Sequence, residues 1–436
     1  MKETVAVIGG GGRESALVES YSKGRNVGRI LAFPGNDLMQ DNSVKPVQIF
    51  PQLKTTDIPE IIEVCKKENV GLVDVAQDNA IAAGFVDALT KAGIRAMGPT
   101  QKASRIEWDK GWARRFGERH NLPQPSYEVF SSQEEAIKFL EGQEERKRFV
   151  KAGGLARGKG AKSAKNRQEA MQRVREMSDF GKEGEAFVIE DWMEGEEFSA
   201  FALVSGKTVR TVENAQDYKR ENDRDEGENT GSMGSNSPTS LLSPRLQKEV
   251  KEIFKKIAGG LYNEGFPYEG WMYLSGMVEN NRVKIVEVNA RLGDPEAQVI
   301  LPGIENDYFE ITKKVIDGNI EKFRLWRDGR SRIAVAGAAV GYPREADYAR
   351  VFGKEIFGLK EAARVSGVKV YGANVKRVDG RDYVAGGRLF YIMGEGVDLN
   401  RARQKAYEAM SLISIEGNNL HLRTDIGWRD VERLRK

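Results

Sequence analysis

Short apolar runs alternate with amphipathic segments through the first hundred residues. The runs have the length and the aliphatic content of buried strands, and the segments between them place apolar residues at helical spacing. Strands that alternate with helices are typical of a parallel α/β sheet. The predicted strands are TVAVIG (4–9), RILAF (29–33), LVDVA (72–76) and IRAMGP (94–99), and the predicted helices are IPEIIEVCKKEN (58–69) and AGFVDALTKAG (83–93).

The pattern changes after this first unit. A helix is predicted from Trp108 to Gly117, and the two prolines of NLPQPSYEVF (121–130) mark a domain boundary. A second unit runs to about Ile189 and a third to about Phe323. The last hundred residues hold short strands and a helix near 401–413, which predicts a separate C-terminal α+β domain.

One stretch, DYKRENDRDEGENTGSMGSNSP (217–238), is polar and charged and contains glycines. By composition it is a mobile loop or a disordered linker. Because long loops inside compact domains are often functional, it is also a candidate binding segment.

Composition narrows the possible chemistry. The chain has 436 residues, enough for several domains, with 68 basic and 65 acidic residues and a net charge of +3, which gives no support for nucleic-acid binding. The first residues predict a strand rather than a signal peptide, and no apolar run is long enough for a membrane span, so we expect a soluble cytoplasmic protein. Two histidines and one cysteine nearly exclude a Ser-His-Asp triad, a multi-histidine metal site and disulfides. Carboxylates, lysines, arginines and backbone amides must therefore carry any reaction.

The segment VKIVEVNARLGDPE (283–296) places Glu287, Asn289 and Arg291 at alternate positions. On a strand these three side chains share one face, and the opposite face carries the apolar residues Val286, Val288 and Ala290. An acid beside an amide is a ligand pair for a hard cation, and the arginine indicates an anion nearby. On this segment alone, a half-exposed strand with ordinary polar alternation is the favoured interpretation.

Two turns follow strands of the first sheet. A strand, the four glycines Gly9 to Gly12 and a helix starting near Arg13 form a cradle whose backbone N–H groups suit a phosphate. Glu14 stands where the dinucleotide fingerprint needs glycine, so a dinucleotide-binding site is disfavoured here. FPGND (33–37) follows the next strand at the same sheet edge and could face a sugar phosphate, although alone it is an ordinary turn.

Two later segments suit a nucleotide. RFVKAGGLARGKGAKSA (148–164) is a basic, glycine-rich stretch after a strand that does not match the P-loop pattern, and we favour phosphate binding over a surface hairpin. FVIEDWMEGEEFSAF (187–201) could present backbone groups to adenine and a carboxylate to ribose. Phosphates bound at residues 148–164 would need a divalent cation, which Glu287 and Asn289 could hold.

These segments together resemble the phosphoribosylamine–glycine ligases, also called glycinamide ribonucleotide synthetases, of the ATP-grasp superfamily. The resemblance covers essentially the whole chain and includes GGGGRES, FPGN, GLARGKG, VIEDWMEGEEFS, NTGSMG, GGRL and RTDIGW. The segments EVNARLGDPEAQ and AQDYKR carry most of the weight.

The resemblance implies a multidomain α/β and α+β fold. Its parts would be a Rossmann-like N-terminal domain (1–107), a linker helix (108–126), an ATP-grasp lid (127–190), an ATP-grasp core (191–325) and a small C-terminal α+β domain (326–436). It implies that ATP, glycine and 5-phosphoribosylamine are joined through a glycyl phosphate, in a monomer or weak homodimer.

The resemblance also implies residue roles. ATP would contact Lys110, Lys151, Gly153, Gly154, Lys159, Gly160, Glu190, Asp191, Met193 and Glu197. Mg²⁺ or Mn²⁺ would bind Glu287 and Asn289. The sugar phosphate and glycine would meet Gly11, Gly12, Arg13, Glu14, Pro34, Gly35, Asn36 and Asp294. Arg291, Asp217 and Lys219 would act in catalysis.

The chain departs from the family at several positions. Ser15 replaces a histidine, Ala76-Gln77-Asp78 stand where the family often has GPE, Gly153-Gly154 replace an acid–glycine pair, and Arg157 and Ser232 replace small residues. Ser15 and Gln77 leave open a ligase for a different amino acid or amine. A catalytically silent nucleotide-binding paralogue is a third hypothesis, against which the intact Lys151, Glu287, Asn289 and Arg291 argue.

Overall fold

The N-terminal unit is the parallel α/β sheet that the alternating pattern predicts. The computed structural model describes residues 2–156 and 160–435 of the chain. All neighbouring strands of the sheet are parallel, and the predicted strand at 94–99 is shorter than expected. The strand order is β3 (Val47–Ile49), β2 (Val27–Pro34), β1 (Glu3–Gly9), β4 (Val70–Val75) and β5 (Ala96–Met97). Its helices are α1 (Gly12–Ser22), α2 (Ile58–Lys67), α3 (Asp78–Ala82) and α4 (Phe85–Lys91).

The turns after β1 and β2 lie against each other at one edge of this sheet. The Gly35 amide donates to the Gly9 carbonyl at 3.2 Å. A Cβ on Gly10 would lie only 2.6 Å from the Gly35 carbonyl oxygen, so only glycine allows this approach. The expected proximity of the two turns is therefore observed.

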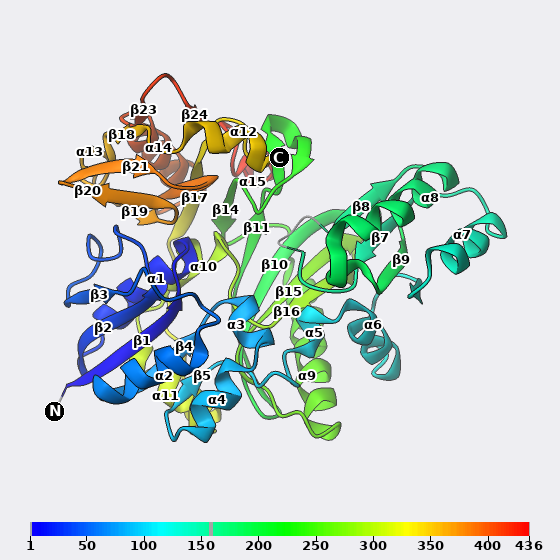
Figure 1. Ribbon diagram of the computed structural model, residues 1–436, viewed down its shortest axis with the longest axis horizontal. Coiled ribbons are helices and arrows are strands. Elements are labelled where there is room, and N and C mark those ends of the chain that lie inside the picture. Colours follow the sequence, from blue (N-terminus) through cyan, green and yellow to red (C-terminus); the bar gives the residue numbers. More distant parts are fainter. Residues whose placement is uncertain (1, 157–159, 436) are drawn as a thin grey trace.

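Two short helices lead from this unit to a small four-stranded sheet, which projects to one side of the molecule (Figure 1). The helices are α5 (Arg105–Trp108) and α6 (Lys110–Arg119), where a single helix from Trp108 was predicted; Asp109 interrupts it and caps α6 through the Trp112 amide. The sheet order is β6 (Tyr127–Phe130), β9 (Phe187–Asp191), β7 (Arg148–Ala152) and β8 (Ala161–Ala164), with helices α7 (Gln133–Glu141) and α8 (Arg167–Arg175).

A large sheet forms the centre of the molecule (Figure 1). Its strand order is β16 (Arg282–Asn289), β15 (Glu269–Glu279), β10 (Glu196–Ser205), β11 (Thr208–Asp217), β14 (Gly234–Ser237), β17 (Ser331–Ala339), β22 (Arg388–Gly396) and β19 (Val368–Gly372), and β24 (Leu420–His421) pairs with β17. Because β14 pairs with β17, one sheet crosses the boundary that we predict near residue 326.

The remaining elements surround this sheet. α9 (Pro244–Asn263) is the longest helix among the described residues, and its apolar face packs on β10, β15 and β16 in one core. No helix in the described part of the chain is long and apolar enough to cross a membrane. The other helices are α10 (Glu296–Ile300), α11 (Tyr308–Ile316), α12 (Glu345–Tyr348), α13 (Leu359–Ala362), α14 (Leu399–Met410) and α15 (Trp428–Leu434). A second C-terminal sheet has the order β20 (Val375–Val378), β21 (Arg381–Val384), β18 (Glu355–Phe357) and β23 (Ser414–Ile415).

The charged stretch 217–238 is neither a mobile loop nor a disordered linker, so that prediction is wrong. It forms the hairpin β12 (Arg220–Asn222) and β13 (Glu226–Asn229) and then enters the large sheet as β14. Tyr218 and Met233 are fully buried. Composition misleads here because the charges find partners in a distant part of the chain.

Candidate active site

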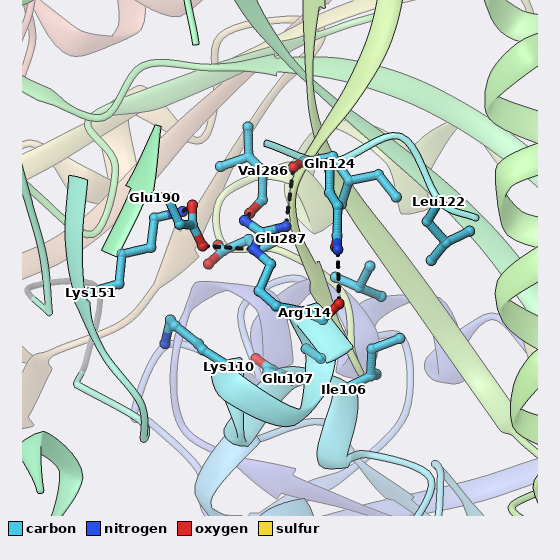
Figure 2. A pocket seen from close by; sticks show the side chains of 13 residues that line it. Ile106, Glu107, Lys110, Arg114, Leu122, Gln124, Lys151, Glu190, Val286 and Glu287 are labelled. Atoms are coloured by element: carbon cyan, nitrogen blue, oxygen red, sulfur yellow. Dashed lines mark hydrogen bonds and ion pairs between the residues drawn. The ribbon is translucent and has the colours of Figure 1, made fainter. Parts of the chain in front are cut away.

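A pocket opens where the small sheet, helix α6 and strand β16 meet (Figure 2). Two of the predicted ATP-binding lysines line it, Lys110 from α6 and Lys151 from β7. Glu190 of β9 and Glu287 of β16 complete its charged wall, and Figure 2 shows Lys110, Lys151 and Glu190 on one side of Arg114. The structure thus brings together four residues that are far apart in sequence.

Glu190 joins two of these cations. Its carboxylate lies 2.7 Å from Lys151 Nζ and 2.6 Å from Arg114 Nε. Burial would raise the pKa of Glu190, but Arg114 and Lys151 outweigh it and lower the pKa to about 2. Arg114 also donates to the Val286 carbonyl at 2.7 Å, which ties α6 to β16. Sequence reasoning missed Arg114, because one arginine on an amphipathic helix carries no local signal.

Lys110 holds the start of α6 against the glycine stretch. Its Nζ donates to the Gly154 carbonyl at 3.2 Å, and its backbone amide donates to the Gly153 carbonyl at 2.9 Å. Burial lowers the pKa of Lys110, against the opposing attraction of Glu287. Lys110 is therefore enclosed beside Glu287 rather than on a solvated helix face.

The other described residues assigned to ATP lie outside the lining of this pocket. Asp191 pairs with Arg146 at 3.1 Å, and Met193 is half-buried on the connector between β9 and β10. Gly160 is buried, and its carbonyl accepts the Ala152 amide at 2.8 Å. Lys159 and the departure at Arg157 lie outside the described residues.

Strand β16 carries Glu287 and Asn289 on one side, as the alternation predicts. Asn289 Nδ2 lies 3.4 Å from Glu287 Oε1, and Arg291 Nη2 lies 3.4 Å from Asn289 Oδ1. The predicted apolar face is partly wrong, since Val288 and Ala290 join the core but Val286 does not. The pairing with β15 shifts between Ser275 and Gly276, and this bulge changes the phase of the strand at Val286.

Glu287 and Asn289 fit a divalent cation that also binds phosphate. Burial would raise the pKa of Glu287, but Lys110, Lys219 and Lys151 outweigh burial and lower it, so the carboxylate is ionised at neutral pH. Among the described residues there is no cluster of three or more acids, histidines or cysteines that could enclose a metal by itself. One carboxylate and one amide oxygen match a cation whose other ligands are phosphate oxygens and water.

Arg291 is held by a residue that sequence reasoning did not single out. Its Nη2 lies 2.9 Å from Glu107 Oε1, and the other Glu107 oxygen accepts the Ala290 amide at 2.7 Å. Burial raises the pKa of Glu107, against the opposing charge of Arg291. Glu107 is the last residue of the segment GPTQKASRIE (98–107), and nothing in that segment indicates its partner.

Asp217 and Lys219 lie beside Glu197. Lys219 Nζ lies 2.9 Å from Glu197 and 3.6 Å from Asp217. Burial, and then the charge of Glu296, raise the pKa of Asp217 to about 7 against the opposing charge of Lys219. Ser232 Oγ donates to Asp217 and so gives this departure a structural role. The group combines a fixed ammonium with a carboxylate that titrates near neutral pH.

The glycine cradle at the start of α1 already holds a carboxylate. Glu14 Oε2 accepts the Gly11 amide at 2.8 Å and lies 3.3 Å from Gln77 Nε2. Arg13 is buried, with Nε 2.6 Å from Glu14 Oε1 and Nη1 donating to the Leu292 carbonyl at 3.1 Å. A phosphate at this position would therefore meet Glu14 as well as Arg13.

The neighbouring turn is tied to the C-terminal part of the chain. Asn36 is buried and donates to Gly10, to Ser15 Oγ at 2.9 Å and to the Gly372 carbonyl at 3.0 Å. Ser15 also donates to Gly372, at 2.7 Å, so the serine that replaces the family's histidine joins α1 to β19. β2 ends at Pro34, and Gly35 follows it beside the cradle.

Asp294 connects the cradle with the central sheet. A Cβ on Gly11 would lie 3.3 Å from Asp294 Oδ2, and one on Gly12 would lie 2.4 Å from Gln298 Nε2. Gln298 donates to Asp294 at 2.6 Å. Arg388, which sequence reasoning missed as an individual residue, donates to the carbonyl of Asp294 at 3.0 Å and to that of Gly231. The glycine turn, the segment after β16 and β22 therefore meet at one place.

Comparisons with known proteins agree with this architecture. Three family models match the chain: the phosphoribosylglycinamide synthetase N domain at residues 3–107, the ATP-grasp (A) domain at 108–297 and the C domain at 332–429. A phosphoribosylamine–glycine ligase from Haemophilus influenzae is 34% identical over 98% of this chain and 99% of its own length. The trifunctional purine biosynthetic protein adenosine-3 of Bos taurus is 34% identical over 100% of this chain, which spans only 43% of that protein.

A solved structure agrees as well. The crystal structure of the phosphoribosylamine–glycine ligase from Thermotoga maritima has a TM-score of 0.80 and 28% identity, with 97% of this chain and 100% of that chain covered. The fold has the N, ATP-grasp and C domains of that family, as the resemblance implied. The chain belongs to the phosphoribosylglycinamide synthetase family.

Proposed function

We propose that this protein joins glycine to 5-phosphoribosylamine at the expense of ATP, to give glycinamide ribonucleotide, ADP and phosphate. The observation that carries the proposal is the convergence of Lys110, Lys151 and Glu287 in one pocket between the small sheet and β16. The named ligases that match the chain end to end support the same reaction. We also propose Mg²⁺ or Mn²⁺ as the cation, the cytoplasm as the compartment, and a monomer or weak homodimer.

The first step activates glycine. A carboxylate oxygen of glycine attacks the γ-phosphorus of ATP, the bond to the bridging oxygen breaks, and ADP leaves with its electron pair, so that glycyl phosphate forms. Lys110 and Lys151 would hold the phosphates in line, and Arg291 would face the charge that develops during transfer. A divalent cation bound by Glu287 and Asn289 would neutralise phosphate charge.

The second step forms the amide. The amine of phosphoribosylamine attacks the acyl carbon, the carbon–oxygen bond to phosphate breaks, and inorganic phosphate leaves. The attacking amine loses a proton, and we assign Asp217 to receive it because its carboxylate is enclosed beside Lys219. Closure of the small sheet over the pocket would keep water from the glycyl phosphate.

A ligase for a different amino acid or amine is a second candidate. It is favoured by the cradle, where Gln77 contacts Glu14 and Ser15 turns to Gly372. ADP release decides between the two: the proposal expects release with glycine plus phosphoribosylamine above all other pairs. Faster ADP release with another pair would show that this other pair is the substrate pair. ATP binding without ADP release for any pair would indicate a catalytically silent paralogue.

Arg13→Ala tests the sugar-phosphate site. We expect the KM for phosphoribosylamine to rise by about tenfold or more, because a charge-assisted contact is lost and Glu14 is left without its cation. The KM for ATP should stay near the wild-type value, since Arg13 lies in the other part of the site. Steady-state kinetics with each substrate varied measures both KM values. An unchanged KM for the amine would mean that the sugar phosphate binds elsewhere.

The pH dependence tests Asp217. Its pKa of about 7 means that the carboxylate is protonated below that pH and can accept a proton only above it. We therefore expect kcat/KM for the amine to rise with pH through about 7. Asp217→Asn should remove this rise and lower kcat by about 10²-fold or more. An unchanged pH profile in that variant would exclude Asp217 as the proton acceptor.

A further inference from the structure

The motif RTDIGW (423–428) was part of the resemblance and leads into helix α15, but the proposed reaction gives neither a role. Their neighbours are informative. Tyr218 stands between Asp217 and Lys219, and because successive side chains of an extended segment point to opposite sides, its ring lies behind them. The ring is fully buried, and its hydroxyl donates to Asn236 Oδ1 at 3.2 Å. The place of Tyr218 therefore sets the place of its two neighbours.

Two arginines from the C-terminal segment cover that ring. The guanidinium carbons of Arg423 and Arg429 lie 5.3 Å and 5.8 Å from its centroid. Arg423 is fully buried and donates to both oxygens of Asp425, at 2.8 Å and 2.9 Å. Its Nη1 donates to the Arg220 carbonyl at 3.2 Å, one residue after Lys219. Arg423 thus contacts the chain on either side of Lys219.

The hairpin β12–β13 is fastened to the same segment. Asp225 lies 3.0 Å from Arg423 and 2.6 Å from Arg429. The Arg224 amide donates to Asp425 at 2.7 Å, and the Thr424 amide donates to Asp223 at 2.8 Å. The charges that made 217–238 look disordered are therefore neutralised by residues about 200 positions later.

Helix α15 continues this attachment to the strands beside Asp217. Asp430 accepts from Asn236, at 2.6 Å, and from Ser240. Arg433 donates to Glu196 of β10 at 2.7 Å and to Gln216 of β11 at 3.1 Å. Residues 423–433 thus contact β10, β11 and β14.

We propose that Arg423 is a positioning residue. From behind Asp217 and Lys219 it holds both side chains in place for the reaction, acting through Tyr218 and the Arg220 carbonyl. This inference rests on the proposed function for its kinetic consequences. No covalent bond to substrate aligns the reacting groups in this mechanism, so their placement depends on packing. A misplacement of about 1 Å can lower a rate about 100-fold.

The test compares three variants of the full chain. We expect Arg423→Met to lower kcat/KM for glycine and for the amine by about 30-fold or more, with the ATP dissociation constant changed less than about twofold. The midpoint of the pH–rate profile should move, and Arg423→Lys should restore part of the rate. Arg332→Met is the matched control, because Arg332 is equally buried and pairs with Asp328 and Glu395 instead. Equal kinetic losses in Arg423→Met and Arg332→Met would overturn the proposal.

Hydrogen exchange separates this inference from the proposed function. The amides of Tyr218, Thr230 and Met233 bond to Gly234, Lys219 and Tyr218 at 3.0, 2.7 and 2.9 Å. We expect these amides to exchange faster in Arg423→Met but not in Arg332→Met, whatever substrates the enzyme uses. Unchanged exchange would overturn the inference even if the wild type is fully active. If Arg423→Met fails to fold, Arg429→Met, at a partly exposed site on the same ring, decides by the same measurements.

Discussion

Glu287→Ala should lower the rate of ADP formation by about 10³-fold or more while the protein stays folded. Glu287 is an ionised carboxylate of the pocket, and Lys110, Lys219 and Lys151 are the charges that lower its pKa most. Its removal takes away the anionic ligand for the cation and leaves three positive charges around the phosphates. The fold is spared because the side chain is only half-buried and belongs to none of the hydrophobic cores among the described residues.

The matched control for this variant is Glu279→Ala. Glu279 lies on β15 of the same hairpin and accepts the Glu194 amide at 2.7 Å, outside the pocket. The Glu279→Ala enzyme should turn over at nearly the wild-type rate. Titration of Mg²⁺ and of Mn²⁺ at saturating ATP gives the readout. If the Glu287→Ala enzyme kept the wild-type rate and metal dependence, the cation would not bind at β16.

Arg291→Met should lose both activity and stability. Arg291 is the partner of Glu107, whose side chain is 6% exposed, so the variant leaves a carboxylate in the interior without its cation. Breaking such a pair costs about 3–5 kcal/mol of unfolding free energy. The rate of phosphoryl transfer should fall by about 10²–10³-fold, because the guanidinium no longer faces the developing charge.

A double variant separates the two effects. Arg291→Met combined with Glu107→Gln removes the unpaired charge, and the amide can still accept the Ala290 amide. Urea unfolding should show that most of the lost stability returns, whereas the rate should stay low. Recovery of the rate together with stability would mean that Arg291 acts only through the fold.

Local patterns predicted the parts of the site that depend on local geometry. The two-residue period of β16 placed Glu287, Asn289 and Arg291 together, because alternation is a property of any strand. The same period failed at Val286, where a bulge is set by the pairing with β15, about ten residues away. The alternation of strands and helices likewise predicted the parallel N-terminal sheet, but not the pairing of β14 with β17.

Residues with distant partners could not be found in this way. The role of Arg114 is visible only from its partner Glu190, 76 positions later. The role of Glu107 is visible only from its partner Arg291, about 180 positions later. The segment 217–238 has the composition of a linker, and its order depends on charges from Arg423 and Arg429. Ion pairs between remote segments leave no periodic trace in a single sequence.

We propose that the pocket between the small sheet and β16 holds the triphosphate and its cation, and the assigned residue roles depend on this. A crystal structure with magnesium and a nonhydrolysable ATP analogue tests this most directly. We predict phosphates against Lys110 and Lys151 and the cation on Glu287 and Asn289. A nucleotide bound elsewhere, or a cation that does not contact β16, would contradict it.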